Sequence, residues 1–440
     1  MTDENHIKNL IEQAVEDGRK LVTVRQISEL KPIPGADLIQ TAVIENGWTV
    51  VVKVGEFQPG DYCVFFEIDS FLQLSDERFA FLAKNKIIWQ GIEGVRLRTI
   101  RLRKQVSQGL ALPTRLFPEI LDVITEKFGE LNAVTAPLIR KENFTGVIGV
   151  MKWDKPVSAQ LAGSARGNFP SFLRKSDQER AQNMNARIFA YEDWHDTTPM
   201  NVENIPEDAI LDMMGRGELI ALGGKFVNGV DTPNYYRVHK AQASPDTEYE
   251  VSLKMDGSSM TAYVHIIEDD DNYEERKGVC SRNLDLKLED ESSSFVKMAK
   301  GDLLELIAEQ GGKVALQGEL MGPGIQGNRE NFQFNRFFVY NIFDITSQEF
   351  MTPERRLEWI RAANEVGERL FGKKNMIEHV PVLHARTTLK ALGITNMQEL
   401  VAFADGPSMH HAVREGLVFK ALDGSHQFKV ISTKFLEGEE

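Results

Sequence analysis

Cysteine is scarce in this 440-residue chain, which contains only Cys63 and Cys280. Two thiols cannot form a disulfide framework, and neither has a second ligand at the spacing of a metal site. We therefore interpret both as reduced, structural side chains. Long apolar runs are also missing, since no stretch approaches the roughly 18 residues that cross a bilayer. The first ten residues, MTDENHIKNL, lack the pattern of a signal peptide, so we expect a cytoplasmic or otherwise intracellular protein.

Positive charge is the second thing in short supply. Lys and Arg number 51 against 65 Asp and Glu, which gives a formal net charge of -14. Indiscriminate nucleic-acid coating needs a broadly basic surface that releases counterions, so this balance argues against it but permits a local basic channel. The hydrophobic share of 42% and the charged share of 26% are typical of a folded soluble protein. The length predicts two domains.

Short β-branched and aromatic runs fill residues 20–113, and turn-rich pieces such as PIPGAD and GEFQPGD separate them. This pattern is typical of a small all-β barrel. Its run VRLRTIRLRK crowds five basic residues into nine positions, against the acidic balance of the chain. A solvated strand face and a phosphate-binding groove explain this run equally well. The five residues are Arg96, Arg98, Arg101, Arg103 and Lys104.

The middle of the chain is irregular. Residues 134–183 indicate a connector that contacts the following domain, and the turn-rich residues 184–247 indicate an insertion or an elaborated surface. After Tyr249, strand-like runs are interrupted by two helical stretches, FVKMAKGDLLELIAEQ and PERRLEWIRAANEVGERLF. We expect EDDDNYEER, between two strands, to be a solvated hairpin loop. These elements predict an α+β fold without regular βαβ alternation.

A strand-like run at 250–260, EVSLKMDGSSM, places a lysine, an aspartate and a glycine in quick succession. A KxDG tetrapeptide alone is weak evidence, because ordinary residue usage produces one in roughly a tenth of chains of this length. Further elements follow it in a fixed order: GVCSRN, QGELMGPGIQGN, FVYNIFDI, EGLVFK and QFKVIS. Such an ordered set is hard to obtain by accident. Its candidate site residues are Lys254, Asp256, Arg282, Asn283, Glu319, Phe343, Asp344, Glu415, Lys420 and Lys429.

In wording and order, residues 249–435 resemble the covalent lysyl-nucleotidyltransferases, and within that superfamily the ATP-dependent RNA ligases. The front half, with LKPIPGADLI and IRLRKQVSQGLALP, resembles the OB-type module at the N-terminus of one RNA-ligase branch. The resemblance implies an α+β chain with an OB-like β-barrel in residues 1–140. A nucleotidyltransferase domain of antiparallel sheets with flanking helices would follow in residues 141–440, with an elaboration at 184–247.

Lysine suits the chemistry that this resemblance implies. A ligase activates a 5'-phosphate by first storing AMP on a nucleophilic amine, and Lys254 matches that nucleophile. We expect positive charge from a bound Mg2+ and from Lys429 to disfavour the protonated amine. Asp256 lies two residues on, along the same strand face, and with Glu319 and Glu415 it could hold a hydrated Mg2+, with Mn2+ as a substitute. Binding of ribose hydroxyls is an alternative role for Glu319.

The resemblance also assigns a nucleotide pocket. Phe343 matches the aromatic residue that stacks on adenine, with core packing as the alternative, and Asp344 would support the same site. The backbone around Leu253 is expected to contact the adenine edge. The remaining expected contacts are Arg282 and Asn283 for ribose or substrate phosphate, and Lys420 and Lys429 for the wall beside the α-phosphate.

Two positions depart from the family pattern. Many relatives carry a glutamate where this chain has Leu253, and several carry a second lysine where it has Ile431. DNA ligases and capping enzymes usually have an OB domain after the last motif, whereas only a short tail follows Lys429 here. That difference favours the RNA-ligase branch.

We therefore expect an ATP-dependent RNA ligase that joins 3'-hydroxyl and 5'-phosphate RNA ends through lysyl-AMP and an adenylylated 5'-end. We expect it to act as a monomer in RNA repair, with a nicked duplex as one candidate substrate and the basic run 96–104 near its phosphates. Two alternatives stay open. One is a DNA ligase or a capping guanylyltransferase, and the other is an inactive protein that binds RNA ends.

Overall fold

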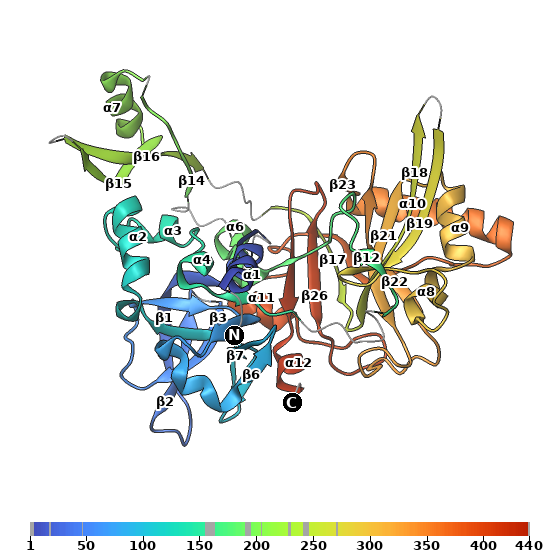
Figure 1. Ribbon diagram of the computed structural model, residues 1–440, viewed down its shortest axis with the longest axis horizontal. Coiled ribbons are helices and arrows are strands. Elements are labelled where there is room, and N and C mark those ends of the chain that lie inside the picture. Colours follow the sequence, from blue (N-terminus) through green and yellow to red (C-terminus); the bar gives the residue numbers. More distant parts are fainter. Residues whose placement is uncertain are drawn as a thin grey trace. The chain divides into compact units, whose positions relative to one another are not determined.

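The computed structural model describes residues 4–16, 19–45, 47–154, 163–189, 195–203, 205–227, 230–240, 246–269 and 272–438 (Figure 1). The chain forms two compact units. Unit 1 combines Met1–Lys155 with Asn185–Ser244, and unit 2 combines Pro156–Met184 with Pro245–Glu440. This division differs from the predicted boundary, because residues 141–155 and 185–244 cluster with the N-terminal unit.

Unit 1 contains the predicted small barrel. A five-stranded antiparallel sheet has the order β10-β4-β1-β2-β3. In β3, Trp48, Val50 and Val52 are buried, and the residues between them are more exposed. This alternation places one face of the strand against a core that includes Phe57 and Phe65. The strands are β1 (Val22–Pro32), β2 (Ile39–Ile44), β3 (Trp48–Lys53), β4 (Tyr62–Phe66) and β10 (Leu110–Pro113).

A second sheet of unit 1 has the order β11-β5-β7-β6. Helix α1 (Glu4–Glu16) places Ile7, Leu10 and Ile11 against Phe71 and Trp89 of this sheet. The other elements here are β5 (Ser70–Gln73), β6 (Ile87–Trp89), β7 (Ile92–Arg96), β11 (Met151–Lys152), the hairpin β8 (Ile100–Leu102) and β9 (Gln105–Ser107), the 3-10 helices η1 (Glu77–Asn85) and η2 (Thr114–Leu116), and the short helices α3 (Ala136–Ile139) and α4 (Thr145–Ile148).

The segment predicted as an insertion builds a three-stranded sheet of order β14-β16-β15 on the surface of unit 1. It packs on helix α2 (Pro118–Phe128), as Figure 1 shows. The rings of Phe128 and Tyr236 stack with centroids 5.8 Å apart, and Asn234 Nδ2 donates to Lys127 O at 3.2 Å. The elements are β14 (His195–Pro199), β15 (Leu219–Val227), β16 (Val230–Lys240), α6 (Asn185–Phe189) and α7 (Glu207–Gly215).

Unit 2 is built on two mainly antiparallel sheets. The larger has the order β12-β20-β19-β18-β21-β22-β23, with β24 beside β22, and the smaller has the order β13-β27-β26-β17-β25. The larger sheet contains β12 (Ala165–Asn168), β18 (Ser258–Asp269), β19 (Asn272–Cys280), β20 (Leu284–Leu286), β21 (Val314–Met321), β22 (Arg336–Asp344), β23 (Glu349–Phe350) and β24 (Glu378–His379). The smaller contains β13 (Glu179–Arg180), β17 (Tyr249–Lys254), β25 (Val382–Thr387), β26 (Gly416–Ala421) and β27 (Gln427–Ile431).

Helices cover one face of the larger sheet. The stretch predicted as one helix at 295–310 forms two, α8 (Ser294–Ala299) and α9 (Asp302–Glu309), because Gly301 adopts a φ of +87° between them. The second predicted helix is confirmed as α10 (Pro353–Phe371). Unit 2 also contains η3 (Ala181–Met184), α11 (Met397–Phe403) and α12 (Thr433–Gly438). No helix in the described ranges is long and apolar enough to span a bilayer.

Candidate active site

Lys254 ends strand β17, opposite Gly416 of β26. Its ammonium donates to Glu415 Oε1, and the two side chains are 24% and 14% exposed. Small residues allow this close approach of strands. A Cβ on Gly416 would lie 2.1 Å from Val430 O, and one on Gly257 would lie 2.5 Å from Leu320 O. The glycines of the KMDG and EGLVFK motifs are therefore required by the packing around the lysine.

Three carboxylates surround this amine. Burial alone would disfavour the ammonium, but Glu415 and then Glu319 outweigh that effect and raise the pKa of Lys254 above its ordinary value. Burial raises the pKa of Glu319 to about 8, and repulsion from Glu415 and Asp256 adds to the shift while Lys254 opposes it. Burial and then Glu415 also raise the pKa of Asp256. The three acids thus favour the protonated amine, whereas the lowering of its pKa that we expect would come from Lys429 and a bound cation.

The same carboxylates fit a divalent cation held through water. Among the described residues, no three His, Cys, Asp or Glu side chains converge closely enough to bind one ion directly. Glu415 Oε2, however, is buried without a hydrogen-bond partner, and three carboxylates crowd around one lysine. Added positive charge would relieve this repulsion, and Mg2+ commonly keeps several of its waters. Asp256, Glu319 and Glu415 are therefore suited to a hydrated ion.

Sequence reasoning missed Arg329, which approaches the same acids. Its NH1 atom lies 3.8 Å from Asp256 Oδ2, and its guanidinium lies 4.4 Å from the ring centre of Phe435. The neighbouring Glu330 is buried and accepts from the backbone N of His410 at 2.6 Å, which anchors the loop. The only sequence sign was a charged pair inside the motif QGNRE.

The aromatic ring in this site belongs to Tyr340, not to Phe343. Gln317 pairs with Asn341 and Gly318 with Val339, so Tyr340 is the extra residue of a β-bulge in β22. Tyr340 is half-buried and hydrogen-bonded to Ser259, and burial followed by Glu319 raises its pKa. The bulge re-aims this side chain toward the site.

Phe343 has a different role from the predicted stacking on adenine. Its side chain is 0% exposed and packs in a cluster with Tyr263 and Cys280. Its ring lies 5.2 Å from that of Phe350. A fully buried ring cannot contact a nucleotide, so the alternative of core packing is correct.

Asp344 also departs from its predicted role. Its Oδ1 accepts from the backbone N of Thr346 at 3.0 Å and of Ser347 at 3.1 Å, and its Oδ2 accepts from Arg355 NH2 at 3.1 Å. These bonds fix the turn after β22. Asp344 therefore stabilises that turn and does not support the nucleotide site directly.

Lys420 lies behind the bulge. It is buried, and its ammonium donates to Tyr340 O and, at 2.6 Å, to Asn341 Oδ1. Burial, then Arg356, lower its pKa well below the ordinary value. Asn341 Nδ2 also donates to Ser176 Oγ at 2.5 Å, which ties the connector to the same strand. Lys420 thus positions Tyr340 and does not line the predicted phosphate wall.

The remaining predicted contacts are spread around the two sheets. Arg282 is exposed in the β19–β20 loop and affects the pKa of Tyr340, whereas Asn283 Oδ1 accepts from Lys175 at 2.9 Å. Lys429 is half-buried on β27, opposite Val418. The two positions that depart from the family pattern are Leu253 and Ile431. The backbone N of Leu253 donates to Pro381 O at 2.9 Å, and Ile431 is buried in the core.

The basic run of unit 1 divides into two groups. Arg96 binds Asp69 Oδ1 at 2.8 Å and lies 3.7 Å from the ring centre of Trp153, so it stabilises the fold. Arg101 is half-buried. The exposed members are Arg98, Arg103 and Lys104.

Comparisons with known proteins agree with this fold. An OB-fold domain family matches residues 21–114, and the RNA ligase family matches residues 247–435. A comparison with curated proteins found no match.

Solved structures of the Naegleria gruberi RNA ligase are similar to this chain. A variant with AMP and manganese is 33% identical, with 95% of this chain and 98% of that chain covered and a TM-score of 0.66. A variant with ATP and manganese is 32% identical with the same coverage and a TM-score of 0.66. The protein with pyrophosphate is 33% identical, with 96% and 99% covered and a TM-score of 0.66. The chain therefore belongs to the RNA ligase family, in the branch with an N-terminal OB domain.

Proposed function

We propose that this RNA ligase joins 3'-hydroxyl and 5'-phosphate RNA ends at the expense of ATP, and that it acts in RNA repair. The observation that carries the proposal is the environment of Lys254. Lys254 ends a buried strand, its amine donates to Glu415, and the charge of Glu319 acts on both this amine and Tyr340. A lysine that served only as a surface charge would need none of these partners. The solved relatives with ATP, AMP and manganese support the same nucleotide and a divalent metal.

In the first step, the Lys254 amine attacks the α-phosphorus of ATP, a P–N bond forms, and pyrophosphate leaves. The ammonium, which donates to Glu415, must first release one proton to solvent so that the nitrogen lone pair is free to attack. A bound Mg2+, with Mn2+ as a substitute, would supply charge neutralisation at the α-phosphate, and Asp256, Glu319 and Glu415 would hold it through water. Neutralising these acids also removes the charges that raise the pKa of Lys254.

The other site residues bind and orient the nucleotide. The Tyr340 ring offers a stacking surface for adenine, and Lys420 holds the backbone of that residue in place. Arg282 and Lys429 offer positive charge for the phosphates. None of these side chains has to transfer a proton. Their contribution is to hold ATP so that its α-phosphorus lies in line with the Lys254 amine.

In the second and third steps, AMP moves from Lys254 to the 5'-phosphate of the RNA, and a 3'-hydroxyl then attacks that phosphate and expels AMP. Both steps leave Lys254 as the free amine. The exposed Arg98, Arg103 and Lys104 of unit 1 would contact the phosphates of the RNA, with a nicked duplex as the substrate.

Covalent labelling tests the proposal. Incubation with [α-32P]ATP and Mg2+ is expected to label the wild-type protein and not Lys254→Ala. Lys390→Ala, which changes an exposed lysine of unit 2, serves as the matched control and should be labelled normally. Labelling by GTP instead of ATP would indicate a capping enzyme, and no label with either nucleotide would favour an inactive protein that binds RNA ends. Sealing of nicked RNA by the labelled enzyme would complete the test.

A further inference from the structure

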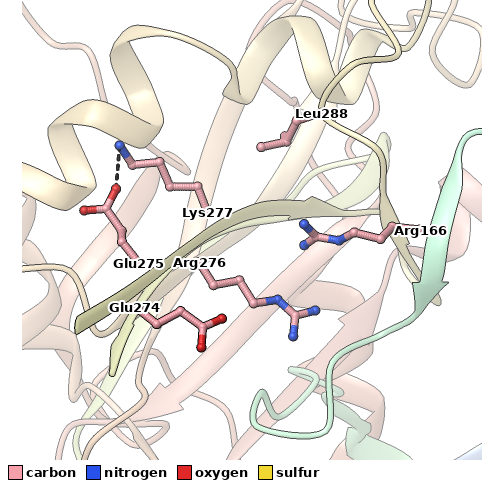
Figure 2. A pocket seen from close by; sticks show the side chains of 6 residues that line it. All are labelled: Arg166, Glu274, Glu275, Arg276, Lys277 and Leu288. Atoms are coloured by element: carbon pink, nitrogen blue, oxygen red, sulfur yellow. Dashed lines mark ion pairs between the residues drawn. The ribbon is translucent and has the colours of Figure 1, made fainter. Parts of the chain in front are cut away.

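Unit 2 carries an open pocket at the β12 and β19 edge of its larger sheet, formed by residues other than those of the Lys254 site (Figure 2). Its volume is about 600 Å3. Figure 2 shows the guanidinium groups of Arg166 and Arg276 side by side at one end of this pocket. The lining residues are Arg166, Glu274, Glu275, Arg276, Lys277 and Leu288.

A buried acceptor fixes the orientation of both arginines. Asp285 is 1% exposed, and its Oδ2 accepts from Arg166 Nε at 3.0 Å, from Arg166 NH2 at 2.7 Å and from Arg276 NH2 at 3.0 Å. The buried Tyr263 hydroxyl accepts from Arg166 NH2 at 2.7 Å and from Arg276 Nε at 3.2 Å. The ring of Phe172 also lies 5.2 Å from the Arg276 guanidinium. These bonds hold the two planar groups before any ligand arrives.

The two arginines keep donors that point to no partner in the described part of the protein. Every hydrogen bond given above uses Nε or NH2, and neither NH1 atom donates to a described residue. Both side chains are 39% exposed. Two guanidinium groups share the single buried carboxylate of Asp285, and the exposed Glu274, two residues before Arg276 on the same face of β19, is the other acid of the lining on that face. An anion with several oxygen acceptors matches these donors.

The remaining lining residues determine where such an anion can lie. Lys277 Nζ is 2.7 Å from Glu275 and 2.8 Å from Glu305, so its charge is already compensated. Glu274 is exposed beside Arg276 and would repel an anion from that side of the pair. The NH1 groups of Arg166 and Arg276 are therefore the favourable position, and a compact anion is expected to bind there.

The position of the pair on the sheet favours a polymer over a second nucleotide. Arg276 lies opposite His265 of β18, and Ser259, which lies opposite Glu319 of the Lys254 site, is six residues before His265 on the same strand. This even spacing places Arg276 on the face of the sheet that carries Glu319, and about 20 Å of extended strand separates the two positions. One RNA strand that starts at the Lys254 site can reach the arginine pair, whereas one ATP molecule cannot reach both.

We propose that Arg166 and Arg276 bind a backbone phosphate of the RNA substrate several nucleotides from the reacting end. This inference rests on the proposed RNA ligase function and adds a second, distant contact to it. The pair acts as a preformed phosphate clamp whose two NH1 groups face the strand.

Binding of a nicked RNA duplex, measured by fluorescence anisotropy over a series of NaCl concentrations, tests the clamp. Arg166→Gln and Arg276→Gln are each expected to weaken binding about 5-fold and to reduce the slope of log Kd against log salt by about 0.7 to 0.9. Arg276→Lys keeps the charge and should preserve the slope while weakening binding. Lys390→Gln removes one exposed charge from unit 2 and should change neither quantity.

A second experiment locates the phosphate. Each backbone phosphate in turn is replaced by a neutral methylphosphonate, and one position several nucleotides from the nick should weaken binding to the wild type but not to Arg276→Gln. Additive effects at every position, or an unchanged salt slope in both glutamine variants, would overturn the clamp. A lowered melting temperature with normal binding and slope would likewise reduce the pair to a structural contact between β12 and β19.

Lysyl-AMP formation, measured on the same preparations, separates the two proposals. The arginine variants should form the adduct at the wild-type rate, because neither residue contacts Lys254 or its carboxylates. A wild-type protein that binds RNA through the clamp but forms no adduct would contradict the ligase function alone. Normal adduct formation without arginine-dependent binding would contradict the clamp alone.

Discussion

At the scale of single residues, Tyr340 and Phe343 lie three positions apart and do different work. Tyr340 is half-buried in the site, whereas Phe343 is fully buried in the core. We expect Tyr340→Ala to raise the KM for ATP in lysyl-AMP formation about 10-fold, because stacking of a base on an aromatic ring is worth roughly 1–3 kcal/mol. Phe343→Leu should instead lower the free energy of unfolding by about 1 kcal/mol and leave KM unchanged. The reverse pattern would restore Phe343 as the stacking residue.

The site could be predicted from sequence where a motif fixes a residue type for one chemical reason. The structure brings Lys254, Asp256, Glu319 and Glu415 together as expected, since only these types supply an amine and metal-binding oxygens. The prediction of Phe343 as the aromatic residue of the site was wrong because a β-bulge changes which side chains of β22 face the site. Arg329 was not predicted because it approaches Asp256 from a loop, and a loop has no periodic pattern that would reveal this position.

His379 provides a test of the buried network behind Tyr340. Arg356 Nε donates to His379 Nε2 at 2.9 Å, and His379 Nδ1 lies 2.6 Å from Val380 O, so the ring must be neutral with its proton on Nδ1. Burial, then the charges of Arg356 and Lys420, lower the pKa of His379 to about 3. In the unfolded chain the same histidine binds its proton near pH 6.5. The contribution of neutral His379 to the free energy of unfolding is therefore fully present above pH 6.5 and is lost as the pH falls toward 3.

We expect the wild type to lose up to about 1.4 kcal/mol of unfolding free energy per pH unit below pH 6.5 through this group. His379→Gln cannot titrate but can still accept from Arg356, so its loss over the same range should be smaller by that amount. Urea denaturation at pH 7, 6 and 5 measures both proteins. Parallel losses in the two would show that His379 is protonated in the folded state.

At the scale of elements, the turn of the hairpin β8–β9 is expected to affect both the stability of the protein and its affinity for RNA. Arg103 and Lys104 form its tip with φ values of +51° and +69°, the left-handed region in which a two-residue turn favours Asn-Gly. Replacing the pair by Asn-Gly should raise the free energy of unfolding by about 1 kcal/mol, because it relieves strain at two side chains. The affinity for nicked RNA and the dependence of that affinity on salt should both decrease, while lysyl-AMP formation should not change. Greater stability with unchanged RNA affinity would remove the hairpin from the interface.

Element prediction succeeded where local pattern and packing agree. Helix α10 has the predicted bounds, since its apolar spacing continues from Pro353 to a left-handed Gly372. The stretch 295–310 shows similar spacing but breaks at Gly301, where the chain turns between α8 and α9. Periodicity alone does not reveal such a break, because both helices place their apolar residues in the same core.

At the scale of the whole molecule, the α+β class and the OB module followed from strand patterns and motif order, but the allocation of segments did not. Residues 185–244 are separated in sequence from α2 and still pack with it. The contact depends on a tight fit at one glycine. Gly223 has a φ of +57°, and a Cβ there would lie 2.3 Å from the carbonyl carbon of Lys127. No periodic pattern carries that information.

Each unit also has hydrophobic clusters of its own, which predicts that calorimetry resolves separate responses in the two. ATP added to Lys254→Ala should raise the melting temperature of unit 2 only, because a ligand at 100 times its Kd adds roughly 2.7 kcal/mol to the free energy of unfolding of the unit that binds it. Gly223→Ala should lower the melting temperature of unit 1 only. Gly217→Ala is the matched control, because its φ is +68° and no atom lies within 4 Å of the added Cβ. Equal losses in the two alanine variants would mean that backbone strain alone, and not docking on α2, sets the stability of this segment.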